Sequence, residues 1–351
     1  MTTMADDGWR VTVGIDTHGE VNVAAVLDAR GRLLATASFA TDARGYRHLE
    51  RWALGFGTID VVGVEGSGAW GAGVARHLGA AGYQVVEVDR PDRKTRRQRG
   101  KSDTIDAEAA ARAVQAGTAS GTPKTRTGPI EAVRALRVAR RSAIKARSQA
   151  AQQLHCLVST SPDALRDDLR ALPIPQLVEL VARFRPGDAH DALQATKASL
   201  RSIARRYQLL THEIDELDAM LGPLVAAIAP NLVALNGVGT DVAGQLLVTA
   251  GDNPDRLRSE AAFAHLCGVS PIPASSGRTD RHRLNRGGDR AANAALYRIV
   301  LCRLRWDPRT RAYAEQRTKQ GLTKPEIIRC LKRYIAREIY RELTRLPLDH
   351  P

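Results

Sequence analysis

The sequence is poor in cysteine, in aromatic residues and in long apolar runs. Its 351 residues include four cysteines, none in a CxxC pair, which argues against a disulfide framework and a cysteine zinc knuckle. No run approaches the roughly 18 apolar residues that a membrane-spanning helix needs. The N-terminus lacks the apolar core of a signal peptide, so we expect a cytoplasmic protein. Aromatic residues make up 4%, so base stacking is not an evident binding mode, and we expect Trp70 and Tyr83 in the core.

Positive charge is present in excess but is unevenly distributed. The formal net charge is +14. Residues 90–150 and 278–351 each carry a net charge of +11, whereas residues 1–89 and 151–277 each carry −4. Two separated basic blocks indicate a polyanion held at two places, and nucleic acid is the polyanion we expect. The candidate contacts are Arg93, Lys94, Arg96, Arg97, Arg99 and Lys101 in the first block, and Arg278, Arg281, Arg283 and Arg286 in the second.

The first hundred residues read as an α/β domain. Three β-branched segments, 11–16, 21–28 and 33–39, predict consecutive strands, and a helix is expected over 45–54. A further strand over 59–65, a helix over 70–81 and a strand over 83–88 follow. Three leading strands, a helix and then alternating strands and helices are the order of a ribonuclease-H-like (RuvC-like) fold.

The remainder of the chain reads as mainly helical. Long amphipathic patterns over 130–158 and 192–221 predict two helices that pair as an antiparallel hairpin or coiled coil, either within the chain or as an oligomerisation arm. Four prolines between 162 and 186 break the stretch between them. Gly237-Val238-Gly239 before a predicted helix resembles a helix-hairpin-helix turn, whose backbone amides could meet a phosphate, although a plain helix cap explains it equally well. Closing helices are expected over 293–304 and 324–343.

Four acidic residues form the candidate catalytic set. Asp16 and Glu65 end predicted strands, at the sheet edge where sites form in α/β folds. Asp103 and Asp106 are three residues apart, which puts both carboxylates on one helix face, although Asp103 could also be a helix cap. Such hard oxygen ligands suit Mg²⁺, and two Mg²⁺ ions can clamp the oxygens of a phosphoryl transfer. His18 could touch substrate or solvent, and the histidines show no zinc-ligand spacing.

Taken together, these motifs resemble the DEDD-type insertion-sequence transposases, also described as bridge-RNA-guided recombinases. The matching pieces are 13–16 with His18, then 64–65 and 101–107, and in the C-terminal half 237–239, 268–271 and 275–277. The resemblance implies a RuvC-like domain over 1–125, a helical coiled-coil segment over 126–225 and a transposase domain over 226–351. It also implies that Asp16, Glu65, Asp103 and Asp106 are the metal-binding catalytic tetrad.

The same resemblance implies a serine nucleophile in the C-terminal domain. Ser276 precedes a glycine as in the family pattern, and Ser275 is the fallback. Its hydroxyl would attack DNA to give a phosphoseryl-DNA link. The family further implies donor and target DNA, a guide RNA, and a homo-oligomer, dimer or tetramer, in which the serine and the carboxylates come from different protomers.

Three other functions share part of the pattern. A metal-dependent structure-specific nuclease, similar to a Holliday-junction resolvase, would use the carboxylates with water but leaves the region around Ser276 unexplained. An actin-like sugar kinase would explain the glycine-containing segment 14–19 but not the two basic blocks. A non-catalytic nucleic-acid-binding protein would not require four carboxylates in register.

Overall fold

A computed structural model gives the fold and describes residues 9–88, 102–278 and 282–346. By compactness the chain forms two units. Among the described residues, the first comprises 9–88, 102–128 and 251–258, and the second comprises 129–250, 259–278 and 282–346. The expected division of the second unit into a coiled-coil segment and a transposase domain remains a prediction, because compactness alone does not define a domain. None of the described helices is long and apolar enough to cross a membrane.

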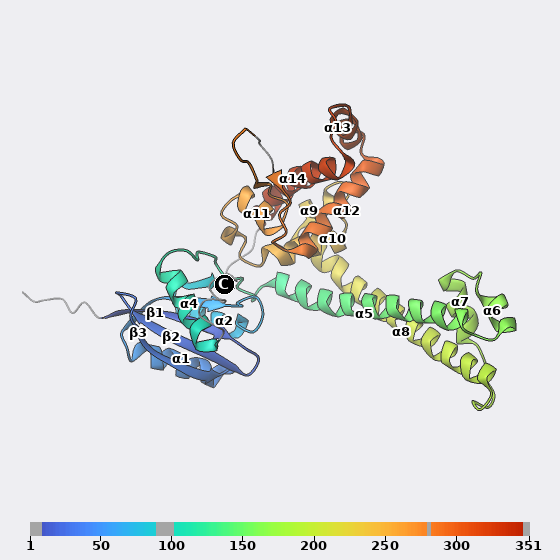
Figure 1. Cartoon of the computed structure of the whole chain (residues 1–351), viewed down its shortest axis with the longest axis horizontal. Coiled ribbons are helices and arrows are strands. Elements are labelled where there is room, and N and C mark those ends of the chain that lie inside the picture. Colours follow the sequence, from blue (N-terminus) through green and yellow to red (C-terminus); the bar gives the residue numbers. More distant parts are fainter. Residues whose placement is uncertain (1–8, 89–101, 279–281, 347–351) are drawn as a thin grey trace, which may run out of the picture. The chain divides into compact units, whose positions relative to one another are not determined.

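The first unit is built on a mixed five-stranded sheet (Figure 1). Its elements are β1 (Arg10–Thr17), β2 (Val21–Asp28), β3 (Leu33–Ala40), α1 (Ala43–Leu54), β4 (Thr58–Glu65), α2 (Ala72–Ala80), β5 (Val85–Val88) and α4 (Asp103–Gln115). The strand order is β3-β2-β1-β4-β5; β1 to β3 are antiparallel, and β4 is parallel to both β1 and β5. The expected ribonuclease-H-like order is confirmed.

The two faces of β1 meet different helices. Val13 and Ile15 belong to an apolar cluster that includes Leu49 of α1 and Leu78 of α2. Successive strand residues point to opposite faces, so the alternate residues, from Thr12 to Asp16, face α4. β1 is therefore buried on both faces from Val11 to Thr17, and it meets α4 through small and polar residues rather than large apolar ones.

A short segment from late in the chain completes the first unit. Residues 251–258 lie between α10 and α11 of the second unit in sequence but group with the first unit. Asn253 donates to the Pro123 carbonyl (2.9 Å), and Arg258 donates to the Ser120 carbonyl (2.5 Å). These contacts hold the strand-like stretch after α4 against residues more than 120 positions further on.

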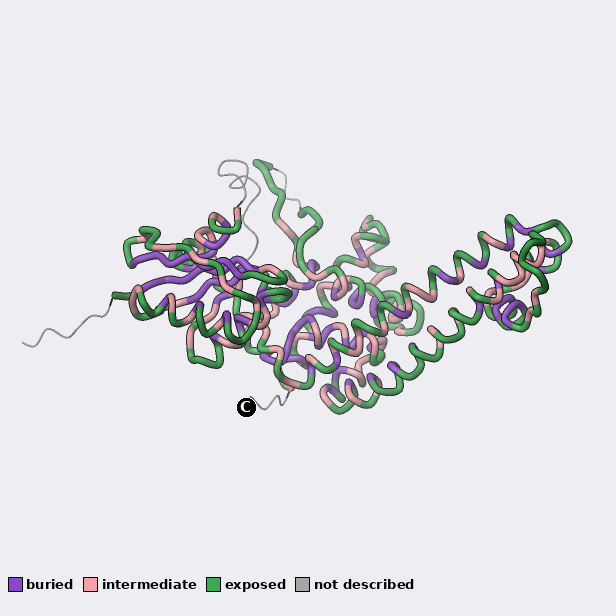
Figure 2. The backbone as a smooth tube through the Cα atoms, turned by 90° about the horizontal axis from the view of Figure 1, so that it is seen from below, coloured by how far each residue is buried: buried purple, intermediate pink, exposed green. Residues whose placement is uncertain are grey.

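The second unit is helical. Its elements are α5 (Pro129–Ser159), α6 (Asp163–Leu169), α7 (Ile174–Ala182), α8 (Ala192–Ile228), α9 (Pro230–Ala234), α10 (Thr240–Ala250), α11 (Glu260–Leu266), α12 (Arg290–Trp306), α13 (Pro308–Lys319) and α14 (Lys324–Leu343), with two short strands, β6 (Ile272–Pro273) and β7 (His282–Arg283). The long helices α5 and α8 lie side by side (Figure 1). Figure 2 shows that much of this pair is exposed and that α6 and α7 cap one end of it with a buried cluster.

Asp241, in the first turn of α10, ties three helices of the second unit together. Its carboxylate accepts hydrogen bonds from Arg137 of α5 (2.7 Å) and Arg298 of α12 (2.6 Å). Although burial opposes the charged form, the neighbouring Arg137 and Arg298 guanidiniums hold the pKa of Asp241 below its usual value. Gly237, in the expected glycine turn, has a φ of 77°, a conformation that glycine adopts readily.

Candidate metal centre

A pair of glycines brings α4 against the sheet. Gly14 of β1 pairs with Gly63 of β4 in the parallel ladder. A Cβ on Gly14 would lie 2.1 Å from the Ala107 carbonyl oxygen, and a Cβ on Gly63 would lie 2.8 Å from the Ala110 carbonyl oxygen. Both distances are too short for real carbon atoms, so α4 can approach this closely only because both positions lack a side chain.

This close approach places the four carboxylates at one edge. Asp16 and Glu65 each follow a paired glycine by two residues, so they project from the same face of the sheet. Asp103 lies one helical turn before Ala107, and Asp106 lies one turn before Ala110, the two alanines that approach the glycines. Both carboxylates are therefore directed toward the ends of β1 and β4. Asp16, Glu65 and Asp106 are buried, whereas the side chain of Asp103 is 52% exposed.

The start of α4 is determined by Ser102. The Ser102 hydroxyl accepts a hydrogen bond from the Ile105 backbone amide at 3.3 Å, so Ser102 is the N-cap. The capping role considered for Asp103 is therefore wrong. Because a neighbouring serine satisfies the helix end, the Asp103 carboxylate is available for another role.

Two of the four carboxylates, together with a histidine, have ligand atoms close enough to one another to hold one metal ion. Ligand atoms of Asp16, His18 and Asp103 all lie within 4.8 Å of one another. His18 Nε2 is 3.1 Å from Asp16 Oδ2 and 3.3 Å from Asp103 Oδ1. Glu65 and Asp106 lie on the same face but are not part of this group. The structure thus brings together residues 87 positions apart, and it places a histidine beside the expected oxygen ligands.

The electrostatics of the centre favour a cation. Burial raises the pKa of Asp16, the carboxylates of Asp106 and Asp103 raise it further, and His18 opposes the rise. Negative charges that destabilise each other in a partly buried site are stabilised by a divalent ion. Carboxylate oxygens with one imidazole are a donor set that Mg²⁺ or Mn²⁺ can use, so the residues present fit such a metal.

Hydrogen bonds also hold the chain that follows the ends of β1 and β4. The Thr17 hydroxyl donates to the Glu65 carbonyl at 2.8 Å, which ties the two strand ends together. Beyond Glu65, the Ser67 hydroxyl donates to Glu87 Oε1 at 2.7 Å. Glu87 in turn forms an ion pair of 3.5 Å with Arg256, from the late segment of the first unit. The loop after Glu65 therefore depends on a residue nearly 200 positions away.

The predicted serines lie in the other unit. Ser275 and Ser276 are exposed on the chain between β6 and β7, and Gly277 beside them has a φ of 54°. Of the expected nucleic-acid contacts, Arg278, Arg283 and Arg286 are exposed. Arg281 and all six basic residues predicted between 93 and 101 lie outside the described residues.

The structure corrects one expected side-chain position and adds one contact that was not expected. Tyr83 packs against the main apolar cluster as expected, but Trp70 is 63% exposed, so its expected place in the core is wrong. It lies in the turn before α2 and next to Gly19. The approach of His18 to both Asp16 and Asp103 was not expected, and its spacing of two residues from Asp16 was the available signal.

Comparisons with known proteins agree with this geometry. The DEDD-type transposase model of the IS110 family matches residues 13–161, which contain all four carboxylates. A second model, "Transposase IS116/IS110/IS902 family", matches residues 229–315, which contain both serines. The fold and the site define a transposase-type ribonuclease-H-like domain joined to a helical unit. The chain belongs to the IS110 family of insertion-sequence transposases.

Curated relatives are proteins of insertion elements. The chain is 27% identical over 208 residues to the "Insertion element IS900 uncharacterized 42 kDa protein" of Mycobacterium paratuberculosis, a match that covers 54% of this chain and 52% of the relative. It is 31% identical over 121 residues to the "Insertion element IS110 uncharacterized 43.6 kDa protein" of Streptomyces coelicolor, covering 33% of this chain and 29% of the relative. The matches thus span about half or less of these relatives.

Proposed function

We propose that this protein is the DNA recombinase of an insertion sequence, which cuts and rejoins DNA with a carboxylate tetrad and a serine nucleophile. The observation that carries the proposal is the meeting of Asp16 with Asp103 and His18 at the end of β1, within a chain of a transposase family. Glu65 and Asp106, buried on the same face, complete the proposed tetrad.

The tetrad would hold Mg²⁺, in one or two ions. When bound, Mg²⁺ supplies positive charge that offsets the negative charge developing on the phosphodiester. Asp16 and Glu65, held by strands whose ends are tied through Thr17, give two rigid anchors. Asp103, exposed at the first turn of α4, lies on the solvent side of the centre, where the DNA would approach.

The serine carries the covalent step in this proposal. The Ser276 hydroxyl oxygen bonds to phosphorus as one phosphorus–oxygen bond of the DNA backbone breaks. The hydroxyl proton passes to a base, and the departing deoxyribose oxygen takes up a proton. The phosphoseryl link keeps the energy of the broken bond, so the reverse attack by a deoxyribose hydroxyl rejoins a strand without a cofactor. The exposed position of Ser276 supports its access to DNA.

Partners complete the proposal. The basic block 278–351 and the exposed Arg278, Arg283 and Arg286 support contacts with donor and target DNA. Ser276 and the carboxylates belong to different compact units, which is compatible with their meeting across protomers of a dimer or tetramer. Guidance by an element-encoded RNA is proposed from the family resemblance.

A covalent-adduct assay tests the serine. Labelled element-end DNA carrying a nick that traps the cleaved state is incubated with protein and Mg²⁺, then denatured and separated by electrophoresis. We expect a protein–DNA adduct that is lost in Ser276→Ala but retained in Ser275→Ala, the matched neighbour. If the adduct is lost in Ser275→Ala alone, the mechanism stands and the nucleophile is Ser275 instead of Ser276.

The same assay separates the second candidate, a structure-specific nuclease that uses water. Strand cleavage by Ser276→Ala and Ser275→Ala without any adduct would favour that nuclease over the recombinase. Asp16→Asn, Glu65→Gln, Asp103→Asn and Asp106→Asn should each abolish cleavage under either mechanism while leaving DNA binding within about threefold. Cleavage that persists in Asp16→Asn would refute the metal centre itself.

A further inference from the structure

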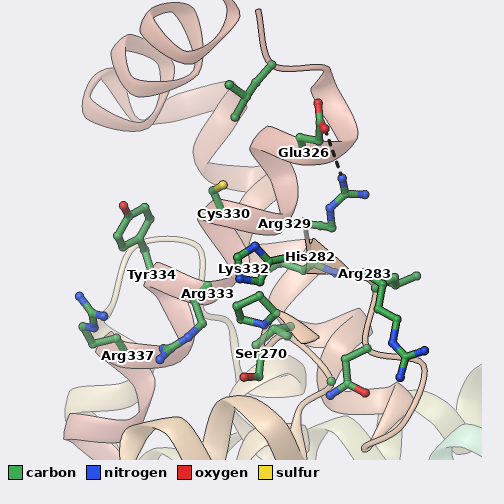
Figure 3. Close-up of a pocket in the computed structure, with 16 residues that line it drawn as sticks. Ser270, His282, Arg283, Glu326, Arg329, Cys330, Lys332, Arg333, Tyr334 and Arg337 are labelled. Atoms are coloured by element: carbon green, nitrogen blue, oxygen red, sulfur yellow. Dashed lines mark ion pairs between the residues drawn. The ribbon is translucent and has the colours of Figure 1, made fainter. Parts of the chain in front are cut away.

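A basic cavity of about 860 Å³ lies within the second unit, at the base of the serine-bearing chain. Residues 268–271 and 282–285 form one side, and α14 forms the other (Figure 3). The lining cations are Arg283, Arg329, Lys332, Arg333 and Arg337. Arg329, Arg333 and Arg337 follow one another at intervals of four residues, so they form a stripe on one face of α14.

Carboxylates neutralise only part of this charge. Glu260 pairs with both Arg333 and Arg337, and Glu326 reaches Arg329 at 3.8 Å. Lys332 donates to the neutral amide oxygen of Asn293 at 2.8 Å. Within the described part of the chain, two carboxylates therefore serve five cations.

The uncompensated charge is partly removed from water. Burial, with Arg329 nearby, lowers the pKa of Lys332, and burial, with Arg337 nearby, lowers the pKa of Arg333. Like charges held together in a half-buried site destabilise each other, and an anion between them would relieve this repulsion. The cavity thus has the electrostatics of an anion site, and its volume exceeds the need of a single phosphate.

Apolar surface faces the same space. The side chains of Tyr334 and Leu284 line the cavity and are 52% and 54% exposed. An exposed aromatic ring beside several cations is the combination that binds single strands, because bases stack on the ring while cations contact phosphates. A site for inorganic anions alone would not require the aromatic ring of Tyr334.

The cavity is also close to the predicted nucleophile along the chain. Pro273 pairs with His282, and His282 lines the cavity. Ser276 follows Pro273 by three residues, which span at most about 10 Å. That length corresponds to about three nucleotides of a duplex strand, at 3.4 Å each. One strand can therefore occupy the cavity and reach Ser276.

We propose that this cavity binds a short stretch of single-stranded DNA through its phosphates, on the strand that continues to Ser276. Arg283 and Arg329 contact phosphates from opposite sides of the cavity, and Tyr334 stacks on a base. The direction of the strand rests on the proposed role of Ser276, but the binding of a single strand in the cavity does not.

The test measures binding without catalysis. Fluorescence anisotropy of a labelled 20-nucleotide single-stranded DNA is recorded against salt for the full chain carrying Ser276→Ala, in EDTA. Adding Arg283→Gln and Arg329→Gln should weaken binding about tenfold or more at 0.1 M salt. The log–log salt slope should fall by about 1.4, at about 0.7 per lost phosphate contact. Both side chains are exposed or nearly half exposed and outside the buried core, so the variant should fold.

A matched control removes the same charge elsewhere. Arg311 and Lys319 are exposed on α13 of the same unit and do not line the cavity. The double variant Arg311→Gln/Lys319→Gln should bind within about twofold of the parent. Equal weakening in both double variants would mean that the basic block acts only through its total charge, and it would overturn the proposal.

Photocrosslinking locates the bound DNA strand within the cavity. DNA with 5-iododeoxyuridine at single sites should crosslink to Tyr334, as mapped by mass spectrometry, and Tyr334→Leu should abolish that crosslink.

Crosslinking at Tyr334 by the matching RNA but not by DNA would overturn the DNA assignment. Complete competition by inorganic phosphate or by a free nucleotide would reduce the cavity to a small-anion site. Cavity binding without any phosphoseryl adduct would leave this inference standing while the proposed serine chemistry fails.

Discussion

Gly14→Ala tests how the metal centre is assembled. The added Cβ would lie 2.1 Å from the Ala107 carbonyl oxygen and 2.3 Å from the Ala111 amide nitrogen. Both atoms are backbone, so no side chain can turn away, and α4 must retreat by more than about 1 Å to reach ordinary contact at 3.4 Å. Because a helix moves as a unit, Asp103 moves with it, away from the end of β1.

Two magnitudes follow from this displacement. Overpacking of this kind costs about 1–3 kcal/mol of folding free energy. A misplacement of about 1 Å in a catalytic group lowers the rate about 100-fold. We therefore expect Gly14→Ala to fold with a lower melting temperature and to lose Mg²⁺-dependent DNA cleavage far beyond its loss of stability. Thermal unfolding and cleavage of labelled DNA at a temperature where the variant is folded measure the two effects.

Two companion variants make the result interpretable. The Cβ of Gly63→Ala would lie 2.6 Å from the Val114 side chain and 2.8 Å from a backbone oxygen. This variant should therefore show the same loss of cleavage in milder form. It replaces Gly14→Ala in the test if Gly14→Ala does not fold. Gly79→Ala, in α2, meets nothing within 4 Å in the described part of the chain and should leave cleavage unchanged. Wild-type cleavage by a folded Gly14→Ala would refute the dependence of the carboxylates on this close contact.

Two predictions concern partly buried ion pairs. Asp241→Asn should lower the free energy of unfolding at pH 7 by about 2 kcal/mol, between the values for buried and exposed ion pairs. The pKa of Asp241 is lowered in the folded state. The stability that its carboxylate contributes is therefore complete above the unfolded pKa of about 3.9 and is lost as the pH falls through the folded pKa. The free energies of unfolding measured at pH 7 and at pH 3 should therefore differ less in Asp241→Asn than in the wild type. Arg256→Ala, which leaves Glu87 without its ion pair, should speed hydrogen exchange in residues 251–258 and slow DNA cleavage; unchanged exchange there would contradict the assigned contact.

Local patterns were sufficient to predict the sheet and the position of two carboxylates at strand ends. The strand ends at Asp16 and Glu65 are visible in sequence because β-branched runs stop at an acid. The glycines that bring α4 close have no such signal, because nothing local distinguishes Gly14 from a turn glycine. The same holds for His18, whose role depends on Asp103, 85 positions away.

Prolines interrupt the stretch between the two long helices as expected, but they also begin helices there. Pro162, Pro173, Pro175 and Pro186 were expected to break this stretch, and it contains the short helices α6 and α7. Pro162 and Pro173 occupy the N-cap positions of these helices, and Pro175 lies in the first turn of α7. Proline lacks an amide hydrogen that the first helical turn does not use, so it starts a helix as readily as it ends one.

The contribution of residues 251–258 to the first unit has a consequence for synthesis. All described residues of that unit that precede 251–258 have been translated once residue 128 has been added, but Arg256, the partner of Glu87, follows about 130 positions later. At about 5–20 residues per second, the ribosome needs roughly 6–26 s to supply it. During that interval the nascent sheet domain has its carboxylates but not the ion pair that supports the loop after Glu65. We therefore expect nuclease competence to arise only after α10 has been translated, when much of the helical unit already exists.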